Sequence, residues 1–371
     1  MLDVSIISIA CGDGQTIAVA CDGSVYGWGC YKDKEGKKWF SPSPAASNPL
    51  KDIKKQQNSP MLISGINNAV EVGCGSVFNV ILLSDGSVLS WGLGECGELG
   101  REVRPIKDDE DAPFNFENIL EDHLTPAHMC TNSKVIRDGK KSSNSSPVKN
   151  VRTFGCGGYH TLVVTGSGES ENNNHLQGGL FSCGLNNYGQ LGTGDFQEQS
   201  LLTHVPLSHI LQPNTTLVSV KAGIHHSLIL SSDGDMYAFG RGDSCQLGLV
   251  EMSQAGGGDA GACCKEPRLV SIPLSDASST TSVKTKSKKS SAFIKQIACG
   301  SNHNFALTDT KDIYSWGYGD LLALGNGKDQ DEPIPKKLNL AKAKNIDTDF
   351  EVSMVSGGGQ HSAIIGTVKQ F

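Results

Sequence analysis

Four of the ten histidines stand at one recurring place in the sequence, three residues after a small-residue turn that ends in glycine. They are His160, His226, His303 and His361. An imidazole there could exchange protons near neutral pH, or it could bond a backbone carbonyl inside its own strand pair. The shared register favours the structural role for any single histidine.

Other site chemistries find little support in the residues. Gly92–Gly97 fits the dinucleotide pattern G-x-G-x-x-G, but no helix pattern follows, so we interpret its glycines as turns. The sequence contains no G-x-x-x-x-G-K-[ST] loop, no nucleophile elbow and no Cys-x-x-Cys pair. We therefore predict no cofactor, no metal, no small-molecule substrate and no covalent chemistry. Four cysteines share one repeat position and are interpreted as small buried apolar residues: Cys11, Cys74, Cys156 and Cys299.

The element that positions these residues is a repeated strand pair. Each of six anchor turns is followed by an apolar strand, and after five of them a second strand ends in aromatic-Gly or Cys-Gly. The anchor glycines are Gly12, Gly75, Gly157, Gly223, Gly300 and Gly358. Periodic strand pairs predict a radial β array, and hence an all-β propeller, of which we count five full cassettes and a half.

One self-similar pattern predicts a single β-propeller domain over residues 1–371. The repeats span approximately residues 4–68, 69–147, 148–217, 218–293, 294–349 and 350–371. The excess length of the long intervals predicts loop insertions at 101–147 and 252–291. The first holds an acidic run, Asp108–Asp111, and a basic segment in which Asp138-Gly139 favours a hairpin turn. The second ends in the basic run Lys284–Lys289 and is expected to be disordered.

The net charge of −7 argues against a protein whose main partner is nucleic acid. No charged start leads into a long apolar run, and no stretch approaches about 18 apolar residues. We therefore expect neither a signal peptide nor a membrane span, and a soluble intracellular protein.

The repeat also carries family-specific motifs. Strands that end in Trp-Gly, the Asn-x-x-Gly-Gln-Leu-Gly turn at 186–192 and the Gly-Gly-x-His-Ser start at 358–362 resemble the regulator of chromosome condensation family. The resemblance runs from about Ile6 to the C-terminus and implies a seven-bladed propeller of four-stranded blades. Because the family ring begins with a further repeat, we expect either that the natural start is missing here or that the ring closes with fewer blades. The final blade is expected to be open or shared.

Gly29–Gly36, Gly94–Arg101 and Gly325–Asp331 are similar to the branch of the family that exchanges guanine nucleotides on the small GTPase Ran. This resemblance implies a Ran-type GTPase as partner, stabilisation of its nucleotide-free form, and a place in the nucleus or the cytoplasm. Partner-binding residues implied by it are Asp13, Arg101, His226 and His361, together with a hairpin wedge that carries Lys134, Arg137, Lys140 and Lys141.

Two departures keep an alternative open. Val77 stands where the exchange factors carry an aspartate. The loop that grips the acidic patch of the nucleosome with arginines in the family is acidic here, with Asp108–Asp111, Glu117, Glu121 and Asp122, so chromatin docking by this route is disfavoured. The alternative function is a non-exchanging scaffold for protein interactions, including chromatin.

Overall fold

The structure is a computed structural model that describes residues 4–40, 54–104, 118–137, 140–166, 178–251, 262–272, 292–340 and 350–368. The described chain consists mainly of antiparallel sheets, and it forms two compact units. Unit 1 comprises residues 1–187 with 195–206, and unit 2 comprises residues 188–194 with 207–371. No helix in the described ranges is both long and apolar enough to span a membrane.

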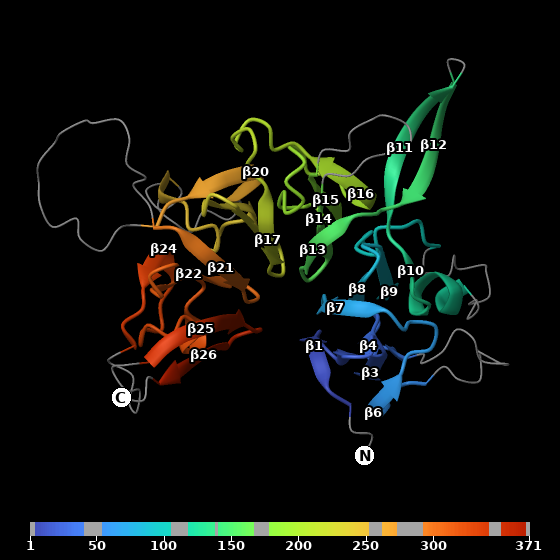
Figure 1. Cartoon of the computed structure of the whole chain (residues 1–371), viewed down its shortest axis with the longest axis horizontal. Coiled ribbons are helices and arrows are strands. Elements are labelled where there is room, and N and C mark those ends of the chain that lie inside the picture. The colour runs from blue at the N-terminus through green and yellow to red at the C-terminus, as the bar shows by residue number, and fades with distance from the viewer. Residues whose placement is uncertain are drawn as a thin grey trace, which may run out of the picture. The chain divides into compact units, whose positions relative to one another are not determined.

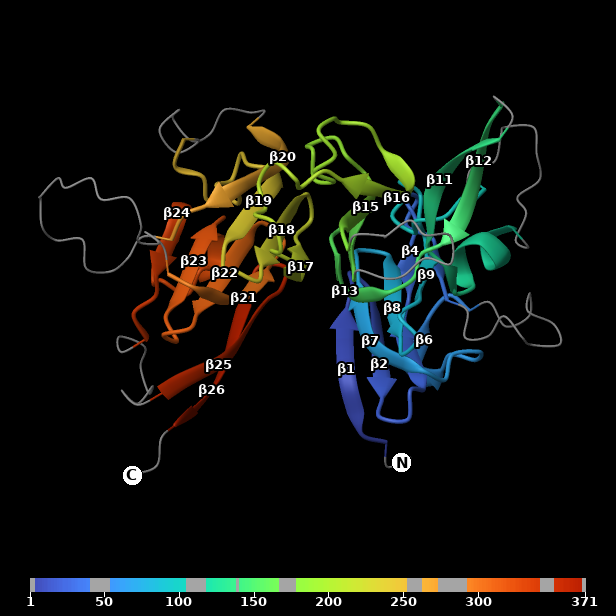
Figure 2. The same ribbon diagram turned by 45° about the horizontal axis from the view of Figure 1, so that its top comes forward.

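Unit 1 contains three sheets (Figures 1 and 2). The first has the order β1-β2-β3-β6, with β1 (Ile6–Cys11), β2 (Gln15–Ala20), β3 (Val25–Gly29) and β6 (Gln57–Leu62). A small hairpin follows β3, made of β4 (Tyr31–Lys32) and β5 (Lys38–Trp39). The second sheet has the order β10-β9-β8-β7, with β7 (Ala69–Cys74), β8 (Phe78–Leu83), β9 (Val88–Gly92) and β10 (Ala127–His128). A short π-helix, η1 (Ile119–Leu124), precedes β10.

The third sheet has six strands. Four repeat the pattern of the other sheets, namely β13 (Val151–Cys156), β14 (His160–Thr165), β15 (Leu180–Gly184) and β16 (Gln199–Val205). The other two form a hairpin, β11 (Cys130–Arg137) and β12 (Lys140–Pro147), which joins the edge where Thr131 pairs with Leu202. The hairpin extends well beyond the sheet (Figure 1). The pairing of Arg137 with Lys140 confirms the predicted hairpin, while Asp138-Gly139 lies outside the described residues.

Unit 2 continues the repeat. Its two four-stranded sheets are β17 (Leu217–Ala222), β18 (His226–Ser231), β19 (Met236–Arg241) and β20 (Cys263–Val270), then β21 (Ile294–Cys299), β22 (His303–Thr308), β23 (Ile313–Gly317) and β24 (Glu332–Lys337). A short 3-10 turn, η2 (Asp320–Leu322), follows β23. The predicted half cassette is a sheet of two described strands, β25 (Phe350–Gly357) and β26 (Ser362–Val368).

The cores lie between consecutive sheets. Ile17 and Val19 of the first sheet pack in one cluster with Val72 and Ile81 of the second. In unit 2, Leu228 of the fourth sheet packs likewise in one cluster with residues of the fifth. A second strand with a sheet against each of its faces has no side exposed to solvent, and β8 and β22 are accordingly buried at every residue.

The strand-ending glycines have a backbone reason. Five of them have φ between +96° and +125°, a region that residues with a side chain rarely adopt: Gly29, Gly92, Gly184, Gly240 and Gly317. The strand then turns at once, and a Cβ atom there would collide with the backbone that precedes the second strand. The Trp-Gly motif is therefore a requirement of the turn.

Both predicted loop insertions need correction. The segment 101–147 contains η1, β10 and the β11–β12 hairpin, and the segment 252–291 contains β20, the outer strand of the fourth sheet. Cys263 and Cys264 therefore lie on a strand. An outer strand pairs with only one neighbouring strand, and its apolar residues alternate weakly with polar ones. For this reason the sequence of β20 was interpreted as part of a loop. The runs Asp108–Asp111 and Lys284–Lys289 lie outside the described residues, as does Glu117.

Candidate partner-binding site

The anchor turns of unit 1 are joined side by side. The N–H of Asp13 donates to the carbonyl of Ser76 at 2.9 Å, and the N–H of Ser76 donates to the carbonyl of Gly158 at 3.1 Å. Gln15, buried at the start of β2, donates from Nε2 to the carbonyl of Gly75 at 3.2 Å. These hydrogen bonds link one sheet to the next, and they bring loops far apart in the sequence to one edge.

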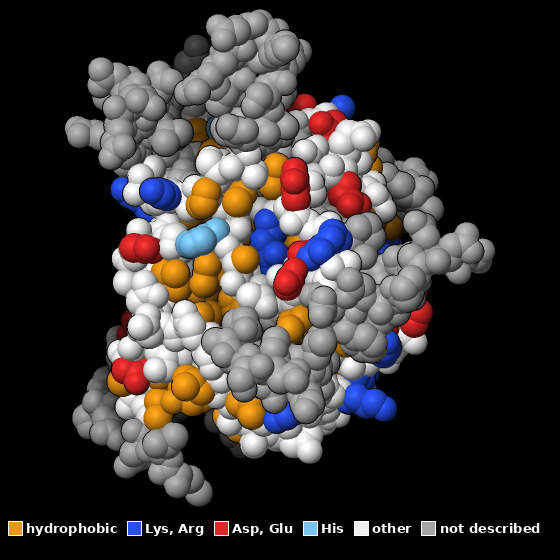
Figure 3. Space-filling view, turned by 90° about the vertical axis from the view of Figure 1, so that its right-hand side faces the viewer, with side chains coloured by type: hydrophobic (Ala, Val, Ile, Leu, Met, Phe, Trp, Pro, Cys, Tyr) orange, Lys and Arg blue, Asp and Glu red, His pale blue; other side chains and the backbone are white. Residues whose placement is uncertain are grey.

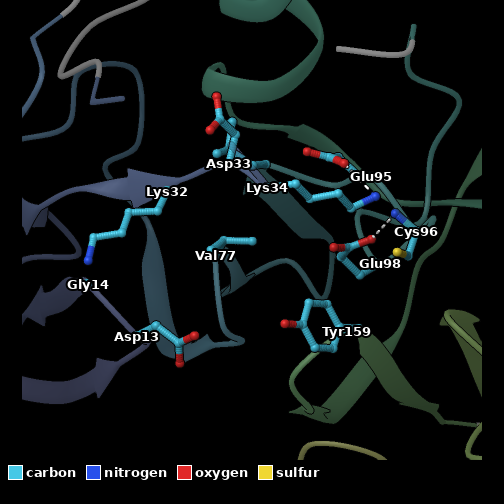
Figure 4. A pocket seen from close by; sticks show the side chains of 11 residues that line it. Asp13, Gly14, Lys32, Asp33, Lys34, Val77, Glu95, Cys96, Glu98 and Tyr159 are labelled. Atoms are coloured by element: carbon cyan, nitrogen blue, oxygen red, sulfur yellow. Dashed lines mark hydrogen bonds and ion pairs between the residues drawn. The ribbon is translucent and has the colours of Figure 1, made fainter. Parts of the chain in front are cut away.

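A pocket with a volume of about 310 Å³ opens among these loops (Figure 4). The anchor turns contribute Asp13, Val77 and Tyr159, while the segment from β4 contributes Lys32, Asp33 and Lys34. The turn after β9 contributes its remaining wall, with Leu93, Glu95, Cys96 and Glu98. Four carboxylates and two ammonium groups thus surround one small space.

Several of these charges already have partners. Lys34 Nζ lies 2.6 Å from Glu95 Oε2, and this hydrogen bond is the main cause of the raised pKa of Lys34. Asp33 accepts from the indole Nε1 of Trp39 at 2.8 Å and from the N–H of Lys37, so it stabilises the β4–β5 hairpin. Asp13 differs because its side chain is exposed and makes no hydrogen bond or ion pair with any residue the structure describes.

Glu98 is the buried acid of the pocket. Its side chain is 1% exposed, and Oε2 accepts a hydrogen bond from the N–H of Cys96 at 2.7 Å. Burial raises the pKa of Glu98 to about 7, against the opposing effect of the backbone hydrogen bonds. Glu98 was not among the predicted site residues, although a carboxylate at a buried repeat position could have singled it out.

Arg101 lies inside the structure rather than on its surface. Its side chain is buried, and Nη2 donates to the carbonyls of Ser90 at 3.4 Å and Thr125 at 3.2 Å. Desolvation lowers the pKa of Arg101 to about 10. The guanidinium therefore joins β9 to the end of η1, and the expected direct contact with a partner is corrected to a supporting role.

The four register histidines differ in exposure. His160, His226 and His303 are almost completely buried, whereas His361 is exposed. His226 Nε2 lies 2.7 Å from Oδ1 of Asn304 on the next sheet, and burial lowers the pKa of His226 to about 4. The ring is neutral and inside the protein, so the expectation that it contacts a partner is corrected. His361 keeps an accessible side chain.

The partly buried neighbour of that buried ring is His225. Its ring packs against Tyr188 at 5.2 Å between centroids, and Arg241 lies over the same tyrosine while pairing with Asp243 at 2.7 Å. Sequence analysis did not select His225, although the doubled histidine marks it. His225 lies in the bend before β18, one residue ahead of the strand that carries His226.

Lys134, Arg137, Lys140 and Lys141 belong to the β11–β12 hairpin, of which the structure describes the backbone at these positions. The neighbouring face of unit 1 carries charges of both signs with apolar side chains between them (Figure 3). Among the described charges of unit 1, Arg104 pairs with both Glu121 and Asp122. The described part of this face is therefore not a basic patch.

Stacked four-stranded sheets with functional groups on the connecting turns define a protein built of β-propeller repeats. The family model of the RCC1-like domain matches residues 1–364, and the chain belongs to this family. The guanine nucleotide exchange factor SRM1 of Saccharomyces cerevisiae is 27% identical over 371 residues, which cover 98% of this chain and 62% of SRM1. The chain thus spans less than two thirds of that relative.

One further relative and one solved structure are also similar to this chain. The regulator of chromosome condensation of Homo sapiens is 25% identical over 366 residues, which cover 98% of this chain and 71% of the human protein. The crystal structure of Prp20p from Saccharomyces cerevisiae, described with its binding properties to Gsp1p and histones, has a TM-score of 0.69 at 24% identity and covers 98% of this chain and 69% of Prp20p. The predicted family and the all-β propeller class are confirmed.

Proposed function

We propose that this chain promotes guanine-nucleotide exchange on a Ran-type GTPase, which binds across the turns that carry the pocket. The proposal is supported by the exchange-factor relatives and by one observation in particular. Asp13 presents an exposed carboxylate at the pocket without a described partner, on a turn that two backbone hydrogen bonds hold in place. A rigid platform with an available charge is suited to binding another protein surface.

Exchange needs differential binding rather than covalent chemistry. A GTPase that holds its nucleotide at roughly picomolar affinity releases it over about days at an ordinary association rate. The platform accelerates release by binding the nucleotide-free form more tightly than the loaded form. In this proposal Asp13 contacts the GTPase, Arg101 supports the second sheet, and the β11–β12 hairpin displaces the phosphate-binding region. His361 is proposed separately as an exposed contact residue of unit 2. The site of action is the nucleus, with chromatin as a further partner.

Asp13→Asn is expected to slow catalysed nucleotide release about tenfold, which corresponds to about 1.4 kcal/mol of lost transition-state stabilisation. The substitution keeps the size of the side chain and removes its charge. The measurement is release of a fluorescent GDP analogue from a purified Ran-type GTPase. The matched control is Asp309→Asn, an exposed aspartate on the turn after β22, which should leave the rate unchanged.

The hairpin makes a separate prediction. Replacing Lys134, Arg137, Lys140 and Lys141 together by serine should reduce the release rate at least tenfold while the complex with nucleotide-free GTPase still forms. The reason is that a wedge acts on the phosphate-binding region, whereas the pocket face holds the partner. Gel filtration of the complex, run beside the release assay, separates the two effects. Equal loss of binding and release would remove the wedge role.

The alternative is a non-exchanging scaffold. It is favoured by Val77, which lines the pocket where the resemblance to exchange factors implies an aspartate. A wild-type chain that binds the GTPase but does not accelerate release, beside an active control protein, would establish this alternative.

A further inference from the structure

Three turns of the protein share one internal hydrogen bond between a side chain and a backbone N–H, which we call the lock. Each follows the third strand of its sheet, at residues 95–98, 187–190 and 243–246, and in each the last side chain accepts the N–H of the residue two positions before it. The distances are 2.7 Å from Cys96 N to Glu98, 3.0 Å from Tyr188 N to Gln190 and 2.8 Å from Ser244 N to Gln246. All three locking side chains are buried. The lock is therefore a repeated structural device.

The backbone carbonyls of the three locking residues also accept equivalent hydrogen bonds in all three turns. The carbonyl of Glu98 accepts from Thr161 Oγ1 at 2.8 Å, and that of Gln190 accepts from Ser227 Oγ at 2.8 Å. The carbonyl of Gln246 accepts from Asn304 Nδ2 at 2.7 Å. Each donor is the second residue of a second strand. Glu98 is thus the positional equivalent of two glutamines, and it differs from them chiefly in that it can ionise.

The surroundings of Glu98 do not neutralise an ionised carboxylate. On its own turn lie Glu95 and the thiol of Cys96, while the loop before β16 contributes Glu198 and β15 contributes the thiol of Cys183. The nearby cation is Lys34, but its ammonium is bonded to Glu95. Burial, with the charges of Glu198 and Glu95 added, raises the pKa of Glu98 to about 7.

We propose that Glu98 is a proton-sensitive lock, which holds the pocket wall closed when its carboxyl is neutral and loosens that wall when the carboxyl ionises. A neutral carboxyl at Glu98 is uncharged, like the amides of Gln190 and Gln246 in the two equivalent turns, here called the sister turns. An ionised Glu98 is a buried charge without a cation bonded to it, and burying such a charge costs free energy. That cost falls when the turn opens toward the pocket, because water then reaches the carboxylate. Because the pocket is the partner-binding site assigned above, the regulatory role rests on the proposed function, although the lock itself does not.

The sign of the pH effect follows from the raised pKa. The folded value of about 7 lies above the unfolded value of 4.5, so the folded protein binds more protons between them. The stability contribution of Glu98 is fully present below about pH 4.5 and is lost as the pH rises through about 7. Partner affinity should fall over the same range as the pocket wall loosens.

Glu98→Gln tests the lock without a partner. Melting midpoints of the wild type and the variant should coincide only below about pH 4.5 and separate as the pH rises from there, and by pH 8 the wild type should lie at least about 2 °C below the variant. Gln190→Glu, which places a carboxyl in a sister turn, should acquire a similar pH dependence. Parallel profiles of wild type and E98Q would overturn the proposal. If E98Q does not fold, carboxyl carbon NMR of the wild type must show one glutamate titrating near neutrality, and its absence would overturn the lock.

Partner binding distinguishes the lock from the proposed function. Affinity of wild type for nucleotide-free Ran-type GTPase should fall about threefold or more between pH 6 and pH 8, while that of E98Q should follow only the pH dependence of the GTPase itself. Identical profiles, or a wild-type affinity that rises with pH, would overturn the regulatory role. Absence of binding by both proteins would count against the proposed function and leave the melting result to decide the lock.

Discussion

Replacing Gly92 by alanine should lower the free energy of unfolding of unit 1 by about 3 kcal/mol or more. Gly92 ends the Trp-Gly strand β9 at φ +125°, and an added Cβ would lie 2.5 Å from both Phe78 Cα and the carbonyl oxygen of Val77. Both obstacles belong to the backbone that enters β8, so neither a rotamer change nor a small side-chain shift relieves the contact. The anchor turn with Val77 would have to move, and the pocket with it.

Gly65 provides the matched control for that substitution. It lies in unit 1 with φ +86°, but an added Cβ there meets nothing within 4 Å. Gly65→Ala should therefore cost only the conformational penalty, about 1 kcal/mol. Urea unfolding followed by far-UV circular dichroism compares the two variants. Equal losses would show that left-handed backbone alone, and not the close approach of two strands, makes the motif glycine necessary.

The second large effect concerns the register histidines. His226→Ala should lower the free energy of unfolding by about 2–4 kcal/mol, because it leaves a cavity and deprives Asn304 Oδ1 of its 2.7 Å partner. His361→Ala, at the same repeat position but exposed, should stay within about 0.5 kcal/mol of wild type. If the proposed function holds, the His361 variant is the one that slows exchange. A stable His226→Ala protein would contradict the assignment of this ring to the core.

A pH series sharpens the comparison. The pKa of His226 is lowered from 6.5 to about 4, so its stability contribution is present above pH 6.5 and is lost as the pH falls through about 4. The pKa of His303 is lowered in the same way by burial. Removing His226 should therefore flatten the acid limb of the stability curve of unit 2, whereas removing His361 should leave that limb unchanged.

The repeat and its strand pairs could be predicted because they are properties of local sequence. Alternating apolar residues determine which strands are buried, and the glycine at φ +96° or more determines where the third strand stops. For the β11–β12 hairpin the sequence indicated only the turn, through Asp138-Gly139, whereas its two strands lie in a segment that was predicted as a loop insertion. Each of these features depends on interactions within a few residues.

Burial of individual repeat positions depends instead on the neighbouring sheet. His226 and His361 occupy the same repeat position. The fifth sheet covers His226 and bonds it through Asn304, whereas His361 is exposed on the last described sheet. Arg101 appears as a loop charge in the sequence, and only the carbonyls of Ser90 and Thr125 show that it is enclosed. The strand β20 became visible only through its pairing with β19.

Glu98 shows most clearly the difference between what the local sequence determines and what the neighbouring sheets determine. The sequence determines that an acid stands where sister turns have glutamine, but a one-letter pattern treats that exchange as conservative. Only the tertiary structure places Glu198 beside the carboxylate and occupies Lys34 with Glu95. Proton affinity is set by solvent access and by charges on other sheets, so it is a property of the assembled fold rather than of the repeat.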